Sequence, residues 1–188
     1  MKKRLPLAIL VMAVLISLDQ FVKYLIDSSF SVGESQPLID NVFQLTYVQN
    51  RGAAWGSFSG KVVFLLIITT VILIGSIYVY IQLARRTDTK FTPLRICLVF
   101  LISGAIGNMI DRIVRGFVVD MFDFCLINFP VFNVADIYVT CSFIVIVILI
   151  MFRYKDDDLT DILHSSKCRT WHPASGFRRR GFVRSLHK

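Results

Sequence analysis

Four long apolar stretches constrain this chain more than any other feature. They cover residues 5–26, 62–83, 94–114 and 137–152, and each approaches the roughly 20 residues that a helix needs to cross a hydrocarbon core. Hydrophobic residues make up 55% of the chain and lie in blocks rather than alternating with polar residues. The sequence therefore predicts an all-α membrane protein with four transmembrane helices. The apolar core of a signal peptide is about 7–15 residues long. The first stretch is longer than this, so we interpret it as a membrane helix and not as a cleaved leader.

The distribution of Lys and Arg predicts how the chain is oriented. The N-terminus, the connection at residues 84–93 and the C-terminal segment are basic, whereas the other two connections contain most of the carboxylates. The positive-inside rule then places both termini in the cytoplasm and the two acidic connections outside. We expect residues 1–154 to form the membrane domain and residues 155–188 to form a polar, basic, disordered cytoplasmic tail near anionic lipid head groups. The net charge of +8 thus indicates topology and no nucleic-acid partner.

The first outer connection contains a pattern that is typical of a β-strand. Residues 42–48 (VFQLTYV) are rich in β-branched and aromatic side chains, and Gln44 and Thr46 fall on one face. We therefore expect a small extracytoplasmic β-rich element at the membrane surface. Trp55 and Phe58, which follow it, are candidate interface anchors.

The same connection continues with the sequence NRGAAWG, which starts at Asn50. The Asn50 amide can both donate and accept hydrogen bonds. Small residues such as Gly52 would allow backbone to approach a ligand closely. The alternative, which the sequence leaves open, is a glycine-rich turn before a helix.

Polar residues also interrupt two of the apolar stretches. Asp19 and Lys23 are four residues apart and so share one helical face. They are either an ion pair that extends to the outer interface or part of a site. Asn108, Asp111 and Arg112 lie on neighbouring positions near the end of the third stretch. We interpret Asp111 and Arg112 as an interfacial charge network that holds the following loop.

The second outer connection contains three acids, Asp120, Asp123 and Asp136. Carboxylates beside a bilayer are costly and are by default functional. Two of them held together could share a proton and activate a water molecule, and we expect Asp120 and Asp136 to be that pair. Asp123 remains an alternative to Asp120. Asp136 could instead be a helix-start carboxylate, because Asn133 suits a helix N-cap.

Five separated motifs follow one another along these segments. They are DQxxK from Asp19, NxGAAxG from Asn50, GAxGNxxDR from Gly104, VVD ending at Asp120 and FNxAD ending at Asp136. On a four-helix hydropathy profile, this set resembles the lipoprotein signal peptidases, the type II signal peptidases of bacteria. Trp55 and Ile137 depart from the family pattern, where Phe and a small or polar residue are usual, and this affects the expected substrate fit.

The resemblance implies a membrane aspartyl endopeptidase with catalytic residues Asp120 and Asp136. Its substrates would be diacylglyceryl-modified prolipoproteins, cut just before the lipidated cysteine at the outer face of the bacterial cytoplasmic (inner) membrane. It implies no metal or organic cofactor. Because one chain carries every site residue, we expect a monomer. The residues expected to bind substrate or support the site are Asp19, Asn50, Gly52, Asn108, Arg112 and Asn133.

Other kinds of site and protein are less compatible with the sequence. All three histidines lie in the C-terminal segment, and the four cysteines show no CxxC spacing, so we expect no metal site. A small transporter or channel subunit, with carboxylates lining a cation path, is the main alternative. It predicts charges deep within several spans and often an internal repeat. A membrane adaptor without catalytic activity would leave the paired acids unexplained.

Overall fold

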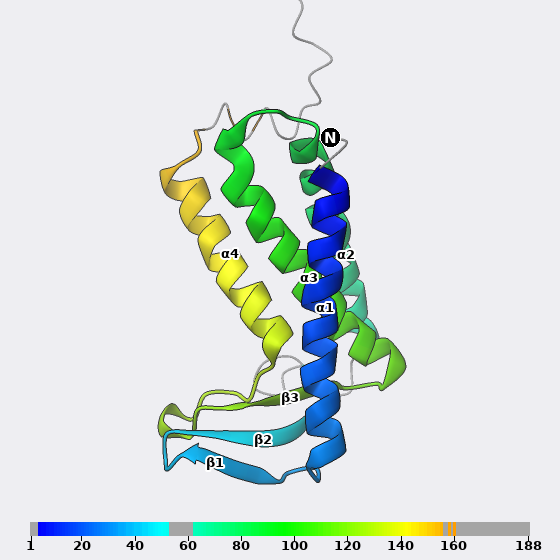
Figure 1. The fold of residues 1–188 in the computed structure, drawn as a ribbon, viewed down its shortest axis with the longest axis vertical. Helices are drawn as coiled ribbons and strands as arrows, with labels where there is room; N and C mark the ends of the chain where they lie inside the picture. The colour runs from blue at the N-terminus through cyan, green and yellow to red at the C-terminus, as the bar shows by residue number, and fades with distance from the viewer. Residues whose placement is uncertain (1–3, 53–61, 156–157, 159, 161–188) are drawn as a thin grey trace, which may run out of the picture.

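The computed structural model describes residues 4–52, 62–155, 158 and 160 (Figure 1). It contains four long helices, α1 (Arg4–Ser29), α2 (Val62–Ala84), α3 (Thr92–Val114) and α4 (Val134–Phe152). Each is long and apolar enough to cross a membrane, which confirms the four predicted spans. The fourth starts three residues earlier than expected, because Asn133 caps the helix and so brings Asp136 into its first turn.

Helix α3 is the central element of the bundle and contacts the other three helices. Of the most apolar 18 residues of this span, 50% are buried inside the protein, compared with between 6% and 17% for the other spans. Small residues explain the close packing against α4. A Cβ atom on Gly104 would lie only 2.4 Å from the Ala135 carbonyl oxygen, so the two backbones can approach there only because the side chain is absent.

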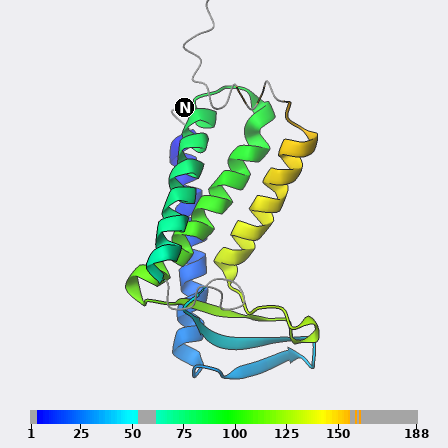
Figure 2. The same ribbon diagram turned by 180° about the vertical axis from the view of Figure 1, so that it is seen from behind.

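A three-stranded antiparallel sheet lies at one end of the bundle (Figures 1 and 2). Its order is β1 (Ser35–Ile39), β2 (Phe43–Asn50) and β3 (Val118–Asp123). The strand predicted at residues 42–48 is thus confirmed as β2, and the connection between α3 and α4 contributes β3. Because β2 pairs with β3, the connection after α1 and the connection after α3 are joined, with Asn50 opposite Val118.

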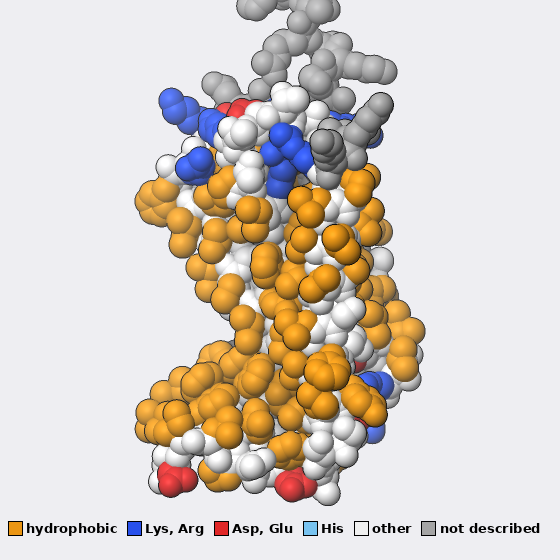
Figure 3. Space-filling model, viewed as in Figure 1, with side chains coloured by type: hydrophobic (Ala, Val, Ile, Leu, Met, Phe, Trp, Pro, Cys, Tyr) orange, Lys and Arg blue, Asp and Glu red, His pale blue; other side chains and the backbone are white. Residues whose placement is uncertain are grey.

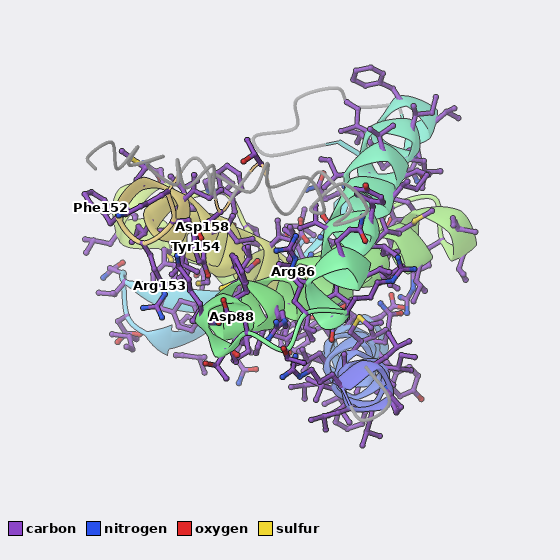
Figure 4. All side chains as sticks on the ribbon, turned by 90° about the horizontal axis from the view of Figure 1, so that it is seen from above. Arg86, Asp88, Phe152, Arg153, Tyr154 and Asp158 are labelled. Carbon is purple, nitrogen blue, oxygen red and sulfur yellow. The ribbon has the colours of Figure 1, made fainter. Side chains whose placement is uncertain are left out.

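The two ends of the molecule differ in charge. In Figure 3, most of the visible Lys and Arg side chains lie at the end away from the sheet, and apolar side chains continue from the helices onto the sheet. At the basic end, Arg4 of α1 donates to the carbonyl of Arg86, and Tyr154 stacks on Phe91. Figure 4 looks down on this end, where Arg86 and Asp88 follow α2 and Arg153 and Tyr154 follow α4.

Candidate active site

Asp120 is held in β3 by two asparagine side chains. Its side chain is nearly inaccessible, with 1% of the residue exposed. Asn50 Nδ2 donates to Asp120 Oδ2 at 2.8 Å, and Asn133 Nδ2 donates to Asp120 Oδ1 at 2.6 Å. The Gly52 N–H donates to Asn50 Oδ1 at 2.9 Å. Gly52 therefore orients the Asn50 amide so that its nitrogen faces the carboxylate.

Asp136 occupies the first turn of α4 in a reciprocal capping box. The Asp136 N–H donates to Asn133 Oδ1 at 3.0 Å, and the Asn133 N–H donates to Asp136 Oδ2 at 3.2 Å. Asn108 Nδ2 donates to Asp136 Oδ1 at 2.7 Å. Asp136 is thus a helix-start carboxylate, as one alternative proposed, and it is also bound to a polar residue of α3.

Two asparagines connect the carboxylates to each other. Asn133 Nδ2 contacts both Asp120 and Asn108 Oδ1, the latter at 3.2 Å, and Asn108 in turn donates to Asp136. Amides donate and accept without titrating. The two acids therefore belong to one hydrogen-bond network whose connecting members carry no charge.

Both carboxylates line a cavity of about 220 Å³. Its polar wall is formed by Asn50, Asn108 and Arg112 together with the two acids. An apolar wall of the cavity consists of Phe129, Pro130, Val131 and Phe132. The cavity reaches Thr140, one helical turn along α4 from Asp136, so it extends from the sheet toward the apolar part of the bundle.

The environment of Asp120 changes its acidity. Burial, and secondarily the negative charge of Asp136, raises the pKa of Asp120 from the ordinary 3.8 to about 7. The hydrogen bonds from Asn50 and Asn133 act in the opposite direction, because they favour the ionised form. Asp120 therefore titrates much closer to neutral pH than an ordinary aspartate does.

Arg112 lies beside the two acids. Its sequence position suggested a charge network with Asp111, and the family resemblance placed it among the site-supporting residues. Its guanidinium lines the cavity and interacts electrostatically with Asp136 and Asp120 more than with Asp111. Its nitrogens donate to the carbonyls of Asn108 and Gly52. The reason is the helical period, which turns consecutive residues about 100° apart.

The structure separates Asp123 from the other two acids. Asp123 Oδ2 accepts hydrogen bonds from Gln44 at 2.7 Å and from Thr46 at 2.9 Å, and it does not line the cavity. Positions an odd number apart in a strand face opposite sides. Asp123 is therefore a sheet residue, held by the two polar side chains that the sequence placed on one strand face.

Asp19 and Lys23 form the ion pair that one alternative proposed, with Lys23 Nζ 2.9 Å from Asp19 Oδ2, but the pair does not extend to the interface. Both side chains are fully buried, because α1 packs there against α3 and the start of α4. Asp19 does not line the cavity, and its Oδ1 accepts the Ala135 N–H at 2.9 Å. Sequence reasoning missed Lys23 as a site-supporting residue, although its position in the DQxxK motif was a signal.

Other expectations concern metal binding and residues outside the described ranges. Within the described ranges, no three His, Cys, Asp or Glu side chains are arranged to hold a metal ion. The three histidines, Trp55 and Phe58 lie outside the described residues. The apolar wall at residues 129–132 was not among the expected site residues. Its use as a cavity wall depends on β3, which pairs with Phe132 through Phe122.

Comparison with known proteins identifies the family. The model of the family described as signal peptidase (SPase) II matches residues 11–152. The lipoprotein signal peptidase of Brevibacillus brevis is 46% identical over 131 residues, covering 70% of this chain and 85% of that protein. That of Lactococcus lactis subsp. lactis is 41% identical over 151 residues, covering 80% of this chain and 96% of that protein.

Solved structures agree with the sequence relatives. A bacterial membrane enzyme determined by the in meso method at 2.3 Å resolution aligns with a TM-score of 0.71 and 35% identity, covering 79% of this chain and 89% of that one. A second, at 1.9 Å resolution, aligns with a TM-score of 0.70 and 35% identity, covering 80% and 96%. Together with the four spans, these matches show that the chain belongs to the signal peptidase II family of multi-pass bacterial membrane proteins.

Proposed function

We propose that this chain is a membrane aspartyl endopeptidase that removes the signal peptides of diacylglyceryl-modified prolipoproteins by cutting before the lipidated cysteine. Family membership supports the coarser statement, a peptidase that removes signal peptides from prolipoproteins. The observation behind the aspartyl mechanism is that Asp120 and Asp136 line one cavity and share one network of amides. Neither acid needs a metal for the reaction proposed below.

The two acids would divide the catalytic work by their environments. Asp120, with its pKa raised to about 7, would hold the proton that the pair shares. Asp136 would be the ionised partner, because it accepts hydrogen bonds from the Asn133 N–H and the Asn108 amide at the positive end of a helix. Two such carboxylates titrate as one unit.

Hydrolysis then follows as balanced proton transfers. Asp136 takes a proton from water while the water oxygen attacks the carbonyl carbon of the scissile bond. Asp120 gives its proton to the carbonyl oxygen, on which negative charge would otherwise develop. When the tetrahedral intermediate collapses, the C–N bond breaks. Asp136 then protonates the leaving nitrogen, and Asp120 recovers its proton from the hydroxyl group.

The shape of the cavity supports a substrate that arrives from the membrane. The apolar wall at residues 129–132 and the extension to Thr140 suit a signal peptide, whose core is apolar. The diacyl chains can remain in the lipid beside α4, where large apolar side chains such as Phe143 and Ile144 are exposed.

The arrangement in the membrane forms part of the proposal. The cavity lies at the sheet end, opposite the basic end of the molecule (Figure 3), which supports a site at the outer face and cytoplasmic termini. We take residues 1–154 as the peptidase domain and residues 155–188 as a cytoplasmic tail, and we expect a monomer. A cation path is disfavoured, because α2 contains no charged residue and the buried Asp19 and Asp111 are paired with Lys23.

Substitution of single acids tests the mechanism. In detergent, the purified chain should release the signal peptide from a diacylated prolipoprotein peptide, and Asp120→Asn and Asp136→Asn should each lower kcat by at least about 10³-fold. Asp123→Asn is the matched control and should retain most of the activity, because the Asp123 carboxylate accepts from the sheet residues Gln44 and Thr46 and does not line the cavity. Full activity of either dyad variant would refute the mechanism.

A further inference from the structure

A lysine that has no part in the proposed chemistry lies at the centre of a buried polar cluster. The Lys23 side chain is 0% exposed. Its ammonium group contacts Asp19 Oδ2 at 2.9 Å, Asp111 Oδ2 at 2.9 Å and Asn108 Oδ1 at 3.0 Å. An ammonium group has three N–H donors, so every donor of Lys23 has an acceptor and the side chain has a defined position.

Each carboxylate of this cluster binds the backbone directly before a proposed catalytic residue. Asp19 Oδ1 accepts the N–H of Ala135, which precedes Asp136, at 2.9 Å. Asp111 Oδ2 accepts the N–H of Val119, which precedes Asp120, at the longer distance of 3.4 Å. Lys23 holds both carboxylates, so it connects the segments that carry the two acids.

The third acceptor of Lys23 controls the orientation of an amide at the site. Asn108 Oδ1 accepts from both Lys23 and Asn133, so Asn108 Nδ2 faces Asp136. If the amide turned by 180°, its NH₂ group would meet two other donors and Asp136 would face an oxygen. Lys23 thus sets which end of the Asn108 amide is presented to Asp136.

The surroundings of the cluster leave little room for other arrangements. A Cβ atom on Gly107 would lie 2.5 Å from Asp19 Oδ2, so the carboxylate lies directly against α3. Gln20 Nε2 contacts Asp19 Oδ2 at 3.2 Å and Asp111 Oδ1 at 3.3 Å. Helices α1 and α3 therefore form a rigid frame around the lysine, which is the kind of support that precise catalytic geometry requires.

We propose that Lys23 is a positioning residue for the reaction: its buried cluster with Asp19 and Asp111 sets the relative placement of Asp120 and Asp136 and the orientation of Asn108. This inference rests on the proposed function, because the groups that it positions are those of the proposed dyad. Lys23 itself touches neither carboxylate of the dyad through a hydrogen bond or ion pair described in the structure.

Replacement of the lysine is the first test. Lys23→Met should lower kcat by roughly a hundredfold, the scale expected when reacting groups are misplaced by about 1 Å, with KM little changed. The loss of activity at high pH should also move to higher pH, because the charge of Lys23 favours ionised Asp120. Two other charged groups interact with Asp120, namely Asp136 and Arg112. Both are unchanged in this variant.

Two comparisons separate positioning from other effects. Lys90→Met is the matched control, because Lys90 is ion-paired with Asp158 at the opposite end of the molecule, and it should leave kcat and the pH profile unchanged. A charge-neutral triple variant, Lys23→Met with Asp19→Asn and Asp111→Asn, keeps an oxygen for each backbone N–H. It tests Lys23 even if Lys23→Met alone does not fold. The triple variant should remain at least about tenfold slower than wild type in kcat, because the Asn108 amide oxygen loses the Lys23 donor and keeps only that of Asn133.

The outcomes distinguish this inference from the proposed function. Wild-type kcat and an unmoved pH profile in Lys23→Met would overturn the inference alone, as would recovery of wild-type kcat in the triple variant, which would make Lys23 a simple counter-ion. Thermal unfolding measurements would show whether the wild-type chain is folded. If the folded wild-type chain does not cleave the lipidated peptide, the proposed function and the inference both fail.

Discussion

At the scale of single residues, amide side chains determine the roles of the acids. Strand β2 presents two amides to β3: Asn50 donates to Asp120, and Gln44 donates to Asp123. The contacts are similar in length, but only Asp120 lines the cavity. What distinguishes the candidate catalytic acid from the sheet residue is therefore the cavity, which Asp120 lines and Asp123 does not.

The raised pKa of Asp120 gives a pH prediction. Below pH 7 the pair keeps one shared proton, and as pH rises through the pKa of about 7 Asp120 loses it, so kcat/KM should fall on the alkaline side. Asn50→Ala removes a hydrogen bond that favours ionised Asp120. The alkaline limb, which is the fall of kcat/KM at high pH, should therefore move to higher pH. The expected shift is roughly one pH unit, the scale of a charge-assisted hydrogen bond.

The matched variant is Gln44→Ala, which removes the equivalent amide from Asp123. Its alkaline limb should coincide with that of wild type. The measurement is kcat/KM for a diacylated peptide between pH 5 and 9, a range of about two units on either side of the pKa. A limb that moves to lower pH in Asn50→Ala would contradict the assignment of the proton to Asp120.

At the scale of elements, α3 is the frame on which the site is assembled. Its small residues let α4 approach, and its polar end supplies Asn108, Asp111 and Arg112. Asn108 and Arg112 line the cavity, and Asp111 joins the Lys23 cluster. The same helix thus determines both the packing of the bundle and the polar wall of the site, so a change in α3–α4 spacing should affect activity as well as stability.

Gly104→Ala should test that coupling. The added Cβ would lie 2.4 Å from the Ala135 carbonyl oxygen and 2.8 Å from Val139 Cγ2, and backbone atoms cannot yield as a flexible side chain can. We expect a loss of about 1–3 kcal/mol in the free energy of unfolding and a clear reduction in kcat, because Ala135 adjoins Asp136. Denaturant unfolding in detergent and peptide cleavage would measure the two effects.

Gly75→Ala is the control for helix propensity in the same bundle. A Cβ atom there meets nothing within 4 Å, so the substitution should be neutral or stabilise the protein by up to about 1 kcal/mol. Equal behaviour of the two alanine variants would show that α3–α4 contact does not limit the structure at Gly104.

At the scale of the whole molecule, two charged ends enclose an apolar middle. Large apolar side chains are exposed on α1, α2 and α4, which in water would be an extensive patch and in a bilayer face lipid. Most of the Lys and Arg side chains visible in Figure 3 lie at one end, and the sheet and cavity lie at the other. Charge and hydropathy together therefore predict a single orientation in the membrane.

Labelling from one side of the membrane tests this orientation. With the four native cysteines replaced by Ser, Val32→Cys before β1 should react with a membrane-impermeant maleimide in intact spheroplasts, because it is exposed at the sheet end. Thr87→Cys, exposed in the connection after α2, should react only after permeabilisation. The reverse pattern would place the cavity at the cytoplasmic face.

The sequence by itself determined the features that depend on short-range physics. The length and apolarity of four stretches predicted the spans, alternation predicted β2, and Asn133 followed by Asp136 predicted the start of a helix. Each depends on backbone hydrogen bonding and transfer to lipid over one local segment. Asp120 was preferred to Asp123 only through the motif resemblance, because spacing along the chain treats both acids alike.

The tertiary structure alone decided which partner each polar side chain contacts. It turned Arg112 toward the cavity, buried Lys23 between two carboxylates, and joined Asn50 to Asp120 through the pairing of β2 with β3. These contacts join residues far apart in the chain, so they depend on which helix faces meet and on strand register. Helix faces and strand register cannot be derived from hydropathy. The same local sequence can place a charge in the protein interior or at the membrane interface.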